Sequence, residues 1–235
     1  MIFVIKSTKP KMKKLKHLLL IGVVLFTQLN CSAHMDNKLH YSATLLITAV
    51  EEQDHNAVAK ALKAGAAVNT TDRNGRSLLL IATRNKDVVI AKLLVASGAD
   101  VNQQDEIKDS PFLYAGASGS AELVQLYLEH GARFDLFNRY NGTALIPACE
   151  RGHTDVVKLL AHTPGFPINH INRLGWTALL EAIILGDGSA VYVDIVRILI
   201  DAGCDIDIPD HDGITPLQHA RSKGYKEIVA LLSRH

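Results

Sequence analysis

The sequence lacks any apolar run long enough to cross a bilayer as a helix. Its longest run, Leu18 to Phe26, has nine residues, whereas a spanning helix needs about 20. Of the 235 residues, 48% are hydrophobic and 21% are charged, which is an ordinary balance for a globular chain with a sizeable core.

Acidic residues are missing from the first 33 positions, and this head holds six of the 25 lysines and arginines. The remainder therefore has 19 basic side chains against 24 acidic ones, a net charge of −5. Phosphate neutralisation needs clustered lysine and arginine. The acidic body therefore argues against a nucleic-acid partner.

Catalytic and metal-binding motifs are also missing. There is no G-x-S-x-G, no H-E-x-x-H and no phosphate-binding loop. Glu150 and Glu181 have no nucleophile or base partner in the pattern, and His162 and His170 have no third ligand at metal-site spacing. We therefore expect no enzyme activity, no cofactor, no bound metal and no small-molecule substrate.

The head has the order of a secretory signal. In "MKKLKHLLLIGVVLFTQLNCSAH", lysines precede the apolar run, and polar and small residues follow it. Cys31 and Ala33 place small side chains at −3 and −1 of a cut before His34. This pattern predicts a signal peptide over residues 1–33, with Met12 as the true start, and export to a bacterial periplasm.

Two alternatives for the head would place the chain at a membrane. The head could remain uncleaved as an anchor, although its apolar run is short. Cys31 could instead carry a lipid, as in bacterial lipoproteins, although Gln28, Leu29 and Asn30 fit that processing site poorly.

Two sequence markers recur along the chain in phase. One is a joint with copies "GAAVN", "GADVN", "GARFD", "FPIN" and "GCDID", which end at residues 69, 102, 135, 169 and 207. The other is a Ser or Thr before an apolar stretch, at Thr44, Ser77, Ser110, Thr143, Thr177 and Thr215. Both step by 33 or 34 residues, and by 38 at the final step. Markers that step together indicate an internal repeat.

Each repeat is predicted to hold two short helices. The Ser or Thr caps the first helix, and Pro111 and Pro216 follow their caps where a proline loses no hydrogen bond. A second helix carries Leu and Val at helical spacing, as in "DVVIAKLLVA". The joint glycine then ends that helix. A tight turn leads to the next unit, with a glycine at Gly75, Gly142, Gly175 or Gly213.

The chain resembles the ankyrin-repeat proteins, and specifically short exported bacterial members. The carrying stretches are "DGITPLQHARSKG" (212–224), "GWTALLEA" (175–182), "GADVNQQD" (98–105) and "ACERGHTDVVKLL" (148–160). Leu45 and Leu78 stand where the family prefers proline. The resemblance implies an all-α solenoid of about six helix-turn-helix units with short hairpin turns. The expected ankyrin-repeat domain covers 34–235, in units of about 38–69, 70–102, 103–135, 136–169, 170–207 and 208–235.

The stretch "SGADVNQQD" (97–105) has two interpretations. Asp100, Asn102 and Asp105 could begin a calcium loop, but such a loop needs a further acid at its far end, and Glu106 is too near. Because the joint recurs five times, we expect these side chains to satisfy backbone N–H groups of a turn.

The cysteines of the repeat also allow two interpretations. Cys149 and Cys204 could pair after export, but both stand where the repeat places a small side chain in a tight helix contact. We expect two small buried hydrophobic residues rather than a disulfide.

Two segments depart from the repeat. Extra residues fall in "LGDGSAVYVD" (185–194), and insertions in solenoids often lie on a binding face. In "HTPGFPINHIN" (162–172) two prolines replace the Gly-Ala joint. This second segment is either a rigid reshaped turn or a turn shaped for a partner.

The pattern favours a non-enzymatic protein-binding module that uses the turn tips and the concave face. One alternative is a stabilising or inhibitory subunit of a co-exported enzyme. Trp, Tyr and Arg dominate protein interfaces, and the only tryptophan, Trp176, either contacts a partner or packs on the neighbouring tip. The candidate protein-binding residues are Arg73, Arg76, Arg84, Lys108, Tyr114, Arg139, Tyr140, Glu150, Arg151, Arg173, Trp176 and Glu181.

Overall fold

The computed structural model describes residues 43–234. The predicted export segment, with Met12, Cys31 and His34, lies outside the described residues. From Leu46 onward the described residues form one compact unit, which holds the repeat.

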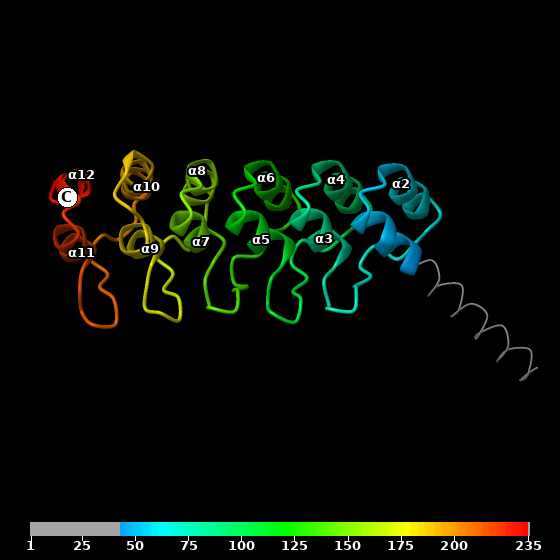
Figure 1. The fold of residues 1–235 in the computed structure, drawn as a ribbon, viewed down its shortest axis with the longest axis horizontal. Helices are drawn as coiled ribbons and strands as arrows, with labels where there is room; N and C mark the ends of the chain where they lie inside the picture. Colours follow the sequence, from blue (N-terminus) through cyan, green and yellow to red (C-terminus); the bar gives the residue numbers. More distant parts are fainter. Residues whose placement is uncertain (1–42, 235) are drawn as a thin grey trace, which may run out of the picture. The chain divides into compact units, whose positions relative to one another are not determined.

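The described residues form six helix pairs in a row (Figure 1). The helical residues 46–51 pair with α2 (His55–Lys63). Then follow α3 (Leu78–Arg84) with α4 (Val88–Ala96), α5 (Pro111–Ala117) with α6 (Ala121–Glu129), α7 (Leu145–Glu150) with α8 (Thr154–Ala161), α9 (Ala178–Ile184) with α10 (Ala190–Asp201), and α11 (Pro216–Ser222) with α12 (Lys226–Leu232). The expected all-α solenoid is confirmed: over 43–234 the one extended pairing is an isolated bridge between Thr71 and Ser77.

The helices of residues 46–234 stack in two layers. The first helices α3, α5, α7, α9 and α11 contact one another in chain order, and so do the second helices α2, α4, α6, α8, α10 and α12. The turns between units project beyond the layer of first helices (Figure 1). Each pair buries its apolar faces against its neighbours, so contacts between adjacent units stabilise the whole stack.

Four of the predicted Ser and Thr caps form as expected. The side-chain oxygens of Ser77, Ser110, Thr177 and Thr215 each accept a hydrogen bond from the backbone N–H three residues later, at 3.1–3.3 Å. A cap of this kind contributes about 1 kcal/mol to helix stability. Sequence spacing thus located the start of these four first helices.

The caps predicted at Thr143 and Thr44 are wrong. α7 begins two residues after Thr143, whose buried hydroxyl has no hydrogen-bond partner among the described residues. In other units the residue four after the cap donates to the cap carbonyl, as Glu181 does to Thr177 at 2.9 Å. Pro147 occupies that place, has no N–H and crowds the carbonyl, so the first turn of the helix is lost. Thr44 lies within the helical stretch 43–51, not before it.

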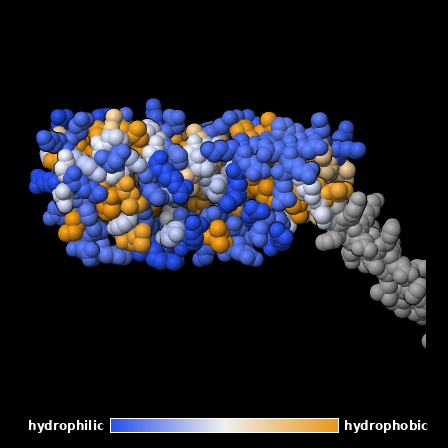
Figure 2. All heavy atoms as spheres, in the orientation of Figure 1, coloured by the Kyte–Doolittle hydropathy of each residue, from blue (hydrophilic) through white to orange (hydrophobic). Residues whose placement is uncertain are grey.

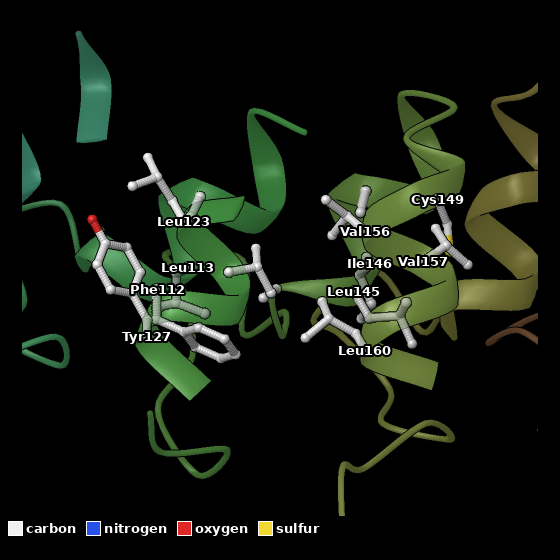
Figure 3. Close-up of a cluster of buried hydrophobic side chains, with 14 of the residues drawn as sticks. Phe112, Leu113, Leu123, Tyr127, Leu145, Ile146, Cys149, Val156, Val157 and Leu160 are labelled. Carbon is white, nitrogen blue, oxygen red and sulfur yellow. The ribbon is translucent and has the colours of Figure 1, made fainter. Parts of the chain in front are cut away.

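The apolar core runs between the two helical layers. Figure 3 shows part of it, where buried side chains of α5 and α6 and of α7 and α8 fill the space between their helices. Rings of the third and fourth units extend it: the Phe112 and Phe134 centroids lie 6.1 Å apart, and those of Phe134 and Phe166 lie 5.0 Å apart. Phe166 is buried and belongs to the irregular segment 162–172. That segment is therefore anchored by packing.

Gly116 allows α5 to approach the chain just before α7. A Cβ at position 116 would lie 2.7 Å from both the Cβ and the carbonyl oxygen of Ala144. Contacts this short force the two units apart, because a carbonyl oxygen of the backbone cannot swing away as a flexible side chain does.

We predict that Gly116→Ala lowers the free energy of unfolding by about 1–3 kcal/mol through overpacking. At an ordinary helical position the same change would stabilise by about 1 kcal/mol. Urea denaturation measures the difference. The neighbouring change Ala117→Gly is the control and should cost only about 1 kcal/mol in helix propensity. A Gly116→Ala variant as stable as the parent would contradict the close approach.

Candidate functional site

Five turns between units share one hydrogen-bond pattern. The first residue of each turn is Asp or Asn, and its side-chain oxygen accepts from the backbone N–H groups two and four residues later, at 2.9–3.0 Å. Short polar side chains hold turns in this way. These five residues are Asp72, Asp105, Asn138, Asn172 and Asp210. Each turn takes the number of the repeat unit in which it lies, so Asp72 begins the second turn and Asp210 begins the sixth.

The fourth residue of each turn has a positive φ. Glycines take this place in three turns, but Lys108 (φ 64°) and Asn141 (φ 58°) take it in the other two. The turn glycine predicted at Gly142 is therefore one residue late, because Asn141 adopts the left-handed conformation. Lys108 does so at a cost of about 1 kcal/mol, which glycine would avoid.

The joint asparagines link neighbouring units. Oδ1 of Asn69 and Oδ1 of Asn102 accept backbone N–H groups of the next joint at 2.9 and 2.8 Å. Asp100 and Asp105 accept N–H groups within their own segments. Asp100, Asn102 and Asp105 of "SGADVNQQD" thus each accept from backbone donors, and the structural interpretation of these side chains is confirmed. The hydrogen bonds that Asn69 and Asn102 form with the next joint were not predicted.

Apolar side chains occupy the third residue, or tip, of three consecutive turns. Ile107, Tyr140 and Leu174 are about half exposed, at 50–52%. Single exposed apolar residues are common, and Figure 2 shows apolar atoms in small patches among hydrophilic ones. Here, however, three successive units present one at the same place, which is typical of a contact surface.

A pocket of about 330 Å³ lies between the fourth and fifth turns, over α7 and α9. Leu174 and Leu185 contribute exposed apolar side chains to it, and Pro147 and Asn172 also line it. Five of the predicted protein-binding residues meet here: Arg139, Tyr140, Glu150, Arg151 and Glu181.

Glu181 is the buried charged group of this pocket, with only 4% of the residue exposed. Its Oε1 accepts a hydrogen bond from Nδ2 of Asn172 at 2.8 Å. Burial, followed by the nearby charge of Glu150, raises the pKa of Glu181 to about 7, and the Asn172 hydrogen bond opposes that rise.

The two arginines of the pocket contact groups both inside and outside it, and Nε of Arg151 lies 4.0 Å from Oε2 of Glu150. The Arg139 guanidinium lies 3.7 Å from Oδ1 of Asp109, and its carbon is 4.9 Å from the ring centroid of Tyr140. Arg151 donates to the backbone carbonyl of Ala117 at 2.6 Å.

Asp109 joins Arg139 to a second group of predicted residues. The guanidinium of Arg84 lies 3.9 Å from the Asp109 carboxylate and 4.7 Å from the ring centroid of Tyr114. Burial and the neighbouring Asp105 raise the pKa of Asp109, while the arginines oppose this. The third and fourth turns are therefore bridged by charge as well as by packing.

The other five predicted residues lie on three turns. Arg76 is bound within its own turn, where Nε donates to Asp72 at 2.7 Å. Trp176 is partly buried next to its cap residue. The remaining three are exposed on the second, third and fifth turns: Arg73, Lys108 and Arg173.

Several residues of the pocket were missed by sequence reasoning. Leu174 shares the tip position with Tyr140, and Asn172 shares the first turn position with Asn138, so the repeat register could have found both. The contact of Asn172 with Glu181, nine residues apart, leaves no signal in the sequence.

The 185–194 insertion ties three units together. It lengthens α10 to 12 residues. The Tyr192 hydroxyl donates to the backbone carbonyl of Glu150 at 2.8 Å, and the Tyr225 hydroxyl donates to that of Gly186 at 2.7 Å. Through Tyr192, the insertion holds the backbone of Glu150, which lines the pocket.

Both described cysteines are free thiols. Cys149 is fully buried, whereas Cys204 is only partly buried. Burial raises the pKa of both thiols, that of Cys204 to about 12. The interpretation as small hydrophobic residues holds fully for Cys149 and in part for Cys204.

Potential metal ligands do not cluster over residues 43–234. In that range no three His, Cys, Asp or Glu side chains gather as a metal site would require. A ring nitrogen of His162 lies 2.9 Å from the Lys158 carbonyl, and one of His170 lies 2.6 Å from the Asn141 carbonyl. Among the described helices, none has the length and apolar character to span a bilayer.

The helix pairs and turns match a known family. A family model described as "Ankyrin repeats (3 copies)" matches residues 11–105 and 112–210. The chain belongs to the ankyrin-repeat family. Ankyrin repeats generally mediate protein–protein interaction, and such proteins are typically non-enzymatic.

Relatives of this ankyrin-repeat chain include bacterial proteins. YahD of Escherichia coli K12, which is named as an ankyrin repeat protein, is 36% identical over 187 residues, covering 79% of this chain and 92% of YahD. A crystal structure of an ankyrin repeat domain from Acinetobacter baumannii AYE has a TM-score of 0.78 and 47% identity, covering 80% of this chain and 96% of that one. The ankyrin repeat protein EF0377 has a TM-score of 0.79 and 41% identity, with coverage of 81% and 97%.

We predict that Glu181→Gln changes how stability depends on pH. The folded chain keeps a proton on Glu181 up to about pH 7, whereas the unfolded chain loses it near pH 4.5. The free energy of unfolding of the parent therefore falls as pH rises between these values. The variant escapes this loss and should exceed the parent by about 1–2 kcal/mol at pH 8, but not at pH 4.

Chemical denaturation at the two pH values measures this difference. The exposed Glu106 provides the control, because Glu106→Gln should leave the pH dependence of the parent unchanged. Identical pH dependence in Glu181→Gln and the parent would show that burial does not raise the pKa of Glu181.

Proposed function

We propose that this chain is an exported, non-enzymatic module that binds another protein through the tips of its third to fifth turns and the adjoining pocket. The observation that carries the proposal is the register of Ile107, Tyr140 and Leu174, which present apolar side chains at three successive tips. Arg139 and Arg151 line the same pocket as Tyr140 and Leu174, and aromatic residues with arginine are the side chains that dominate interface energetics.

The similarity to proteins of Escherichia coli and Acinetobacter baumannii supports a bacterial source. The head of lysines, a nine-residue apolar run and small residues supports export through a cleaved signal. Export would bring the acidic repeat to the periplasm, where its partner would be found.

We predict that the partner can be captured by the parent and lost by a tip variant. The full chain and the Tyr140→Ala, Leu174→Ala double variant would each retain proteins from a periplasmic extract, and mass spectrometry would identify them. Both side chains are half exposed, so their removal should leave the melting temperature nearly unchanged. Proteins retained by both chains are background. If every retained protein binds both equally, the tips are not the interface.

Affinity for that partner should fall on Trp176→Ala and on the double change Arg139→Ala, Arg173→Ala. We expect a loss of about 2 kcal/mol or more at a hot spot. Arg197→Ala is the control, because Arg197 lies on α10 in the other helical layer and pairs with Asp194. Trp176→Ala also tests the second interpretation of this residue. If binding survives while the melting temperature falls, Trp176 packs on the neighbouring tip instead.

We predict that the exported protein begins at His34. Intact mass of the protein released by osmotic shock gives this directly. A species that retains Lys13, or one that begins at a lipidated Cys31, would contradict release into the periplasm.

A further inference from the structure

The pocket between the fourth and fifth turns combines apolar walls with one buried carboxylate. Tyr140, Leu174 and Leu185 are about half exposed there. Glu181 is 4% exposed and lines the same space. Apolar pockets with a few placed polar groups are the usual form of a binding subsite.

One oxygen of Glu181 has no protein partner. Asn172 donates to Oε1, and among the described residues no group donates to Oε2. The fully enclosed side-chain atoms without a partner in residues 43–234 are Oε1 of Gln103 and Oγ1 of Thr143. Because Oε2 of Glu181 is not enclosed in this way, it opens onto the pocket.

The charges around this oxygen leave a place for a cation. Glu150 also lines the pocket and raises the pKa of Glu181, so the two carboxylates repel one another. Arg139 is engaged by Asp109. Arg151 donates to the Ala117 carbonyl and lies 4.0 Å from the carboxylate of Glu150, so neither arginine pairs with Glu181. A buried carboxylate is costly unless a cation pairs with it.

We infer that this pocket binds the side chain of an arginine or lysine in an extended segment of the partner protein. The inference rests on the proposed function and names the group that the partner presents. The methylene groups would lie against Leu174 and Leu185, as long basic side chains do on apolar surface. The charged head would donate to Oε2 of Glu181 and approach Glu150, and charge-assisted bonds of this type are the stronger ones.

Other occupants fit the pocket less well. An acidic side chain would be repelled by Glu150 and Glu181. A purely apolar side chain would cover Glu181 without pairing its charge, which is unfavourable. Each of these becomes a distinct outcome of the test.

The test selects peptides on three forms of the full chain: the parent, Glu181→Gln and Glu106→Gln. A displayed library of random peptides is enriched on each form at pH 8, where Glu181 is ionised. We expect the parent and Glu106→Gln to enrich a basic residue at one position, with apolar residues beside it. Glu181→Gln should not enrich that basic residue. The circular dichroism of all three forms checks that they are folded.

A synthetic peptide of the enriched sequence makes the test quantitative. Its basic residue, made as arginine, is replaced by citrulline, which has nearly the same shape and no charge. Calorimetry on the parent should show an affinity loss of about tenfold or more, as for a hydrogen bond to a charged group. On Glu181→Gln the same replacement should change affinity by less than about threefold, because the charge it removes has lost its main partner.

Several results would overturn the inference: enrichment of acidic or purely apolar peptides on the parent, the same basic residue enriched on Glu181→Gln, or no enrichment on any form. The captured partner separates this inference from the proposed function. If the partner is lost by Tyr140→Ala with Leu174→Ala but binds Glu181→Gln as tightly as the parent, the inference fails and the function stands. If neither variant affects the partner, the proposed function fails.

Discussion

The pair of hydrogen bonds accepted by the first side chain of each turn is the interaction on which the rest of the structure depends. It holds the tips in one conformation and so places Tyr140 and Leu174 in register. The residue type at this position also follows its second contact. Asp210 faces His219, whereas in the fifth turn an amide is needed, because Asn172 must donate to Glu181 while its oxygen holds the turn. An aspartate there could hold the turn but would repel Glu181.

Neighbouring units are joined by contacts that repeat only approximately. Asparagine side chains connect the joints, Asp109 connects Arg84 to Arg139, and Tyr192 and Tyr225 connect the fifth unit to both neighbours. The regular contacts set the spacing of the stack. Among the irregular ones, the hydrogen bond from Tyr192 to Glu150 lies where the fourth and fifth units meet, and it makes this boundary differ from the others. The candidate binding pocket lies at that place, where the period lengthens and Pro147 shortens α7.

Most of the fold was predictable because local sequence signals for helix caps and turns recur at a nearly fixed period. Helix caps at Ser77, Ser110, Thr177 and Thr215 follow from residue type and spacing. The cap predicted at Thr143 does not form because Pro147 cannot donate to the carbonyl four residues before it. The pocket was predictable only in part. The register brought Arg139, Tyr140, Glu150 and Arg151 to one face, but the burial of Glu181 depends on the packing of two units, which no local pattern encodes.

The three phenylalanine rings of the central units determine where the stack can come apart. Opening the stack between the third and fourth units would separate Phe134 from Phe166 and expose aromatic surface on both sides of the break, so these two units are expected to open together. The last helix, α12, buries only Ile228 and Leu232 and therefore separates at a lower free energy. Fraying at this end would leave the fourth turn and α7 formed, so a partner bound there would contact a part of the stack that lies away from the fraying end.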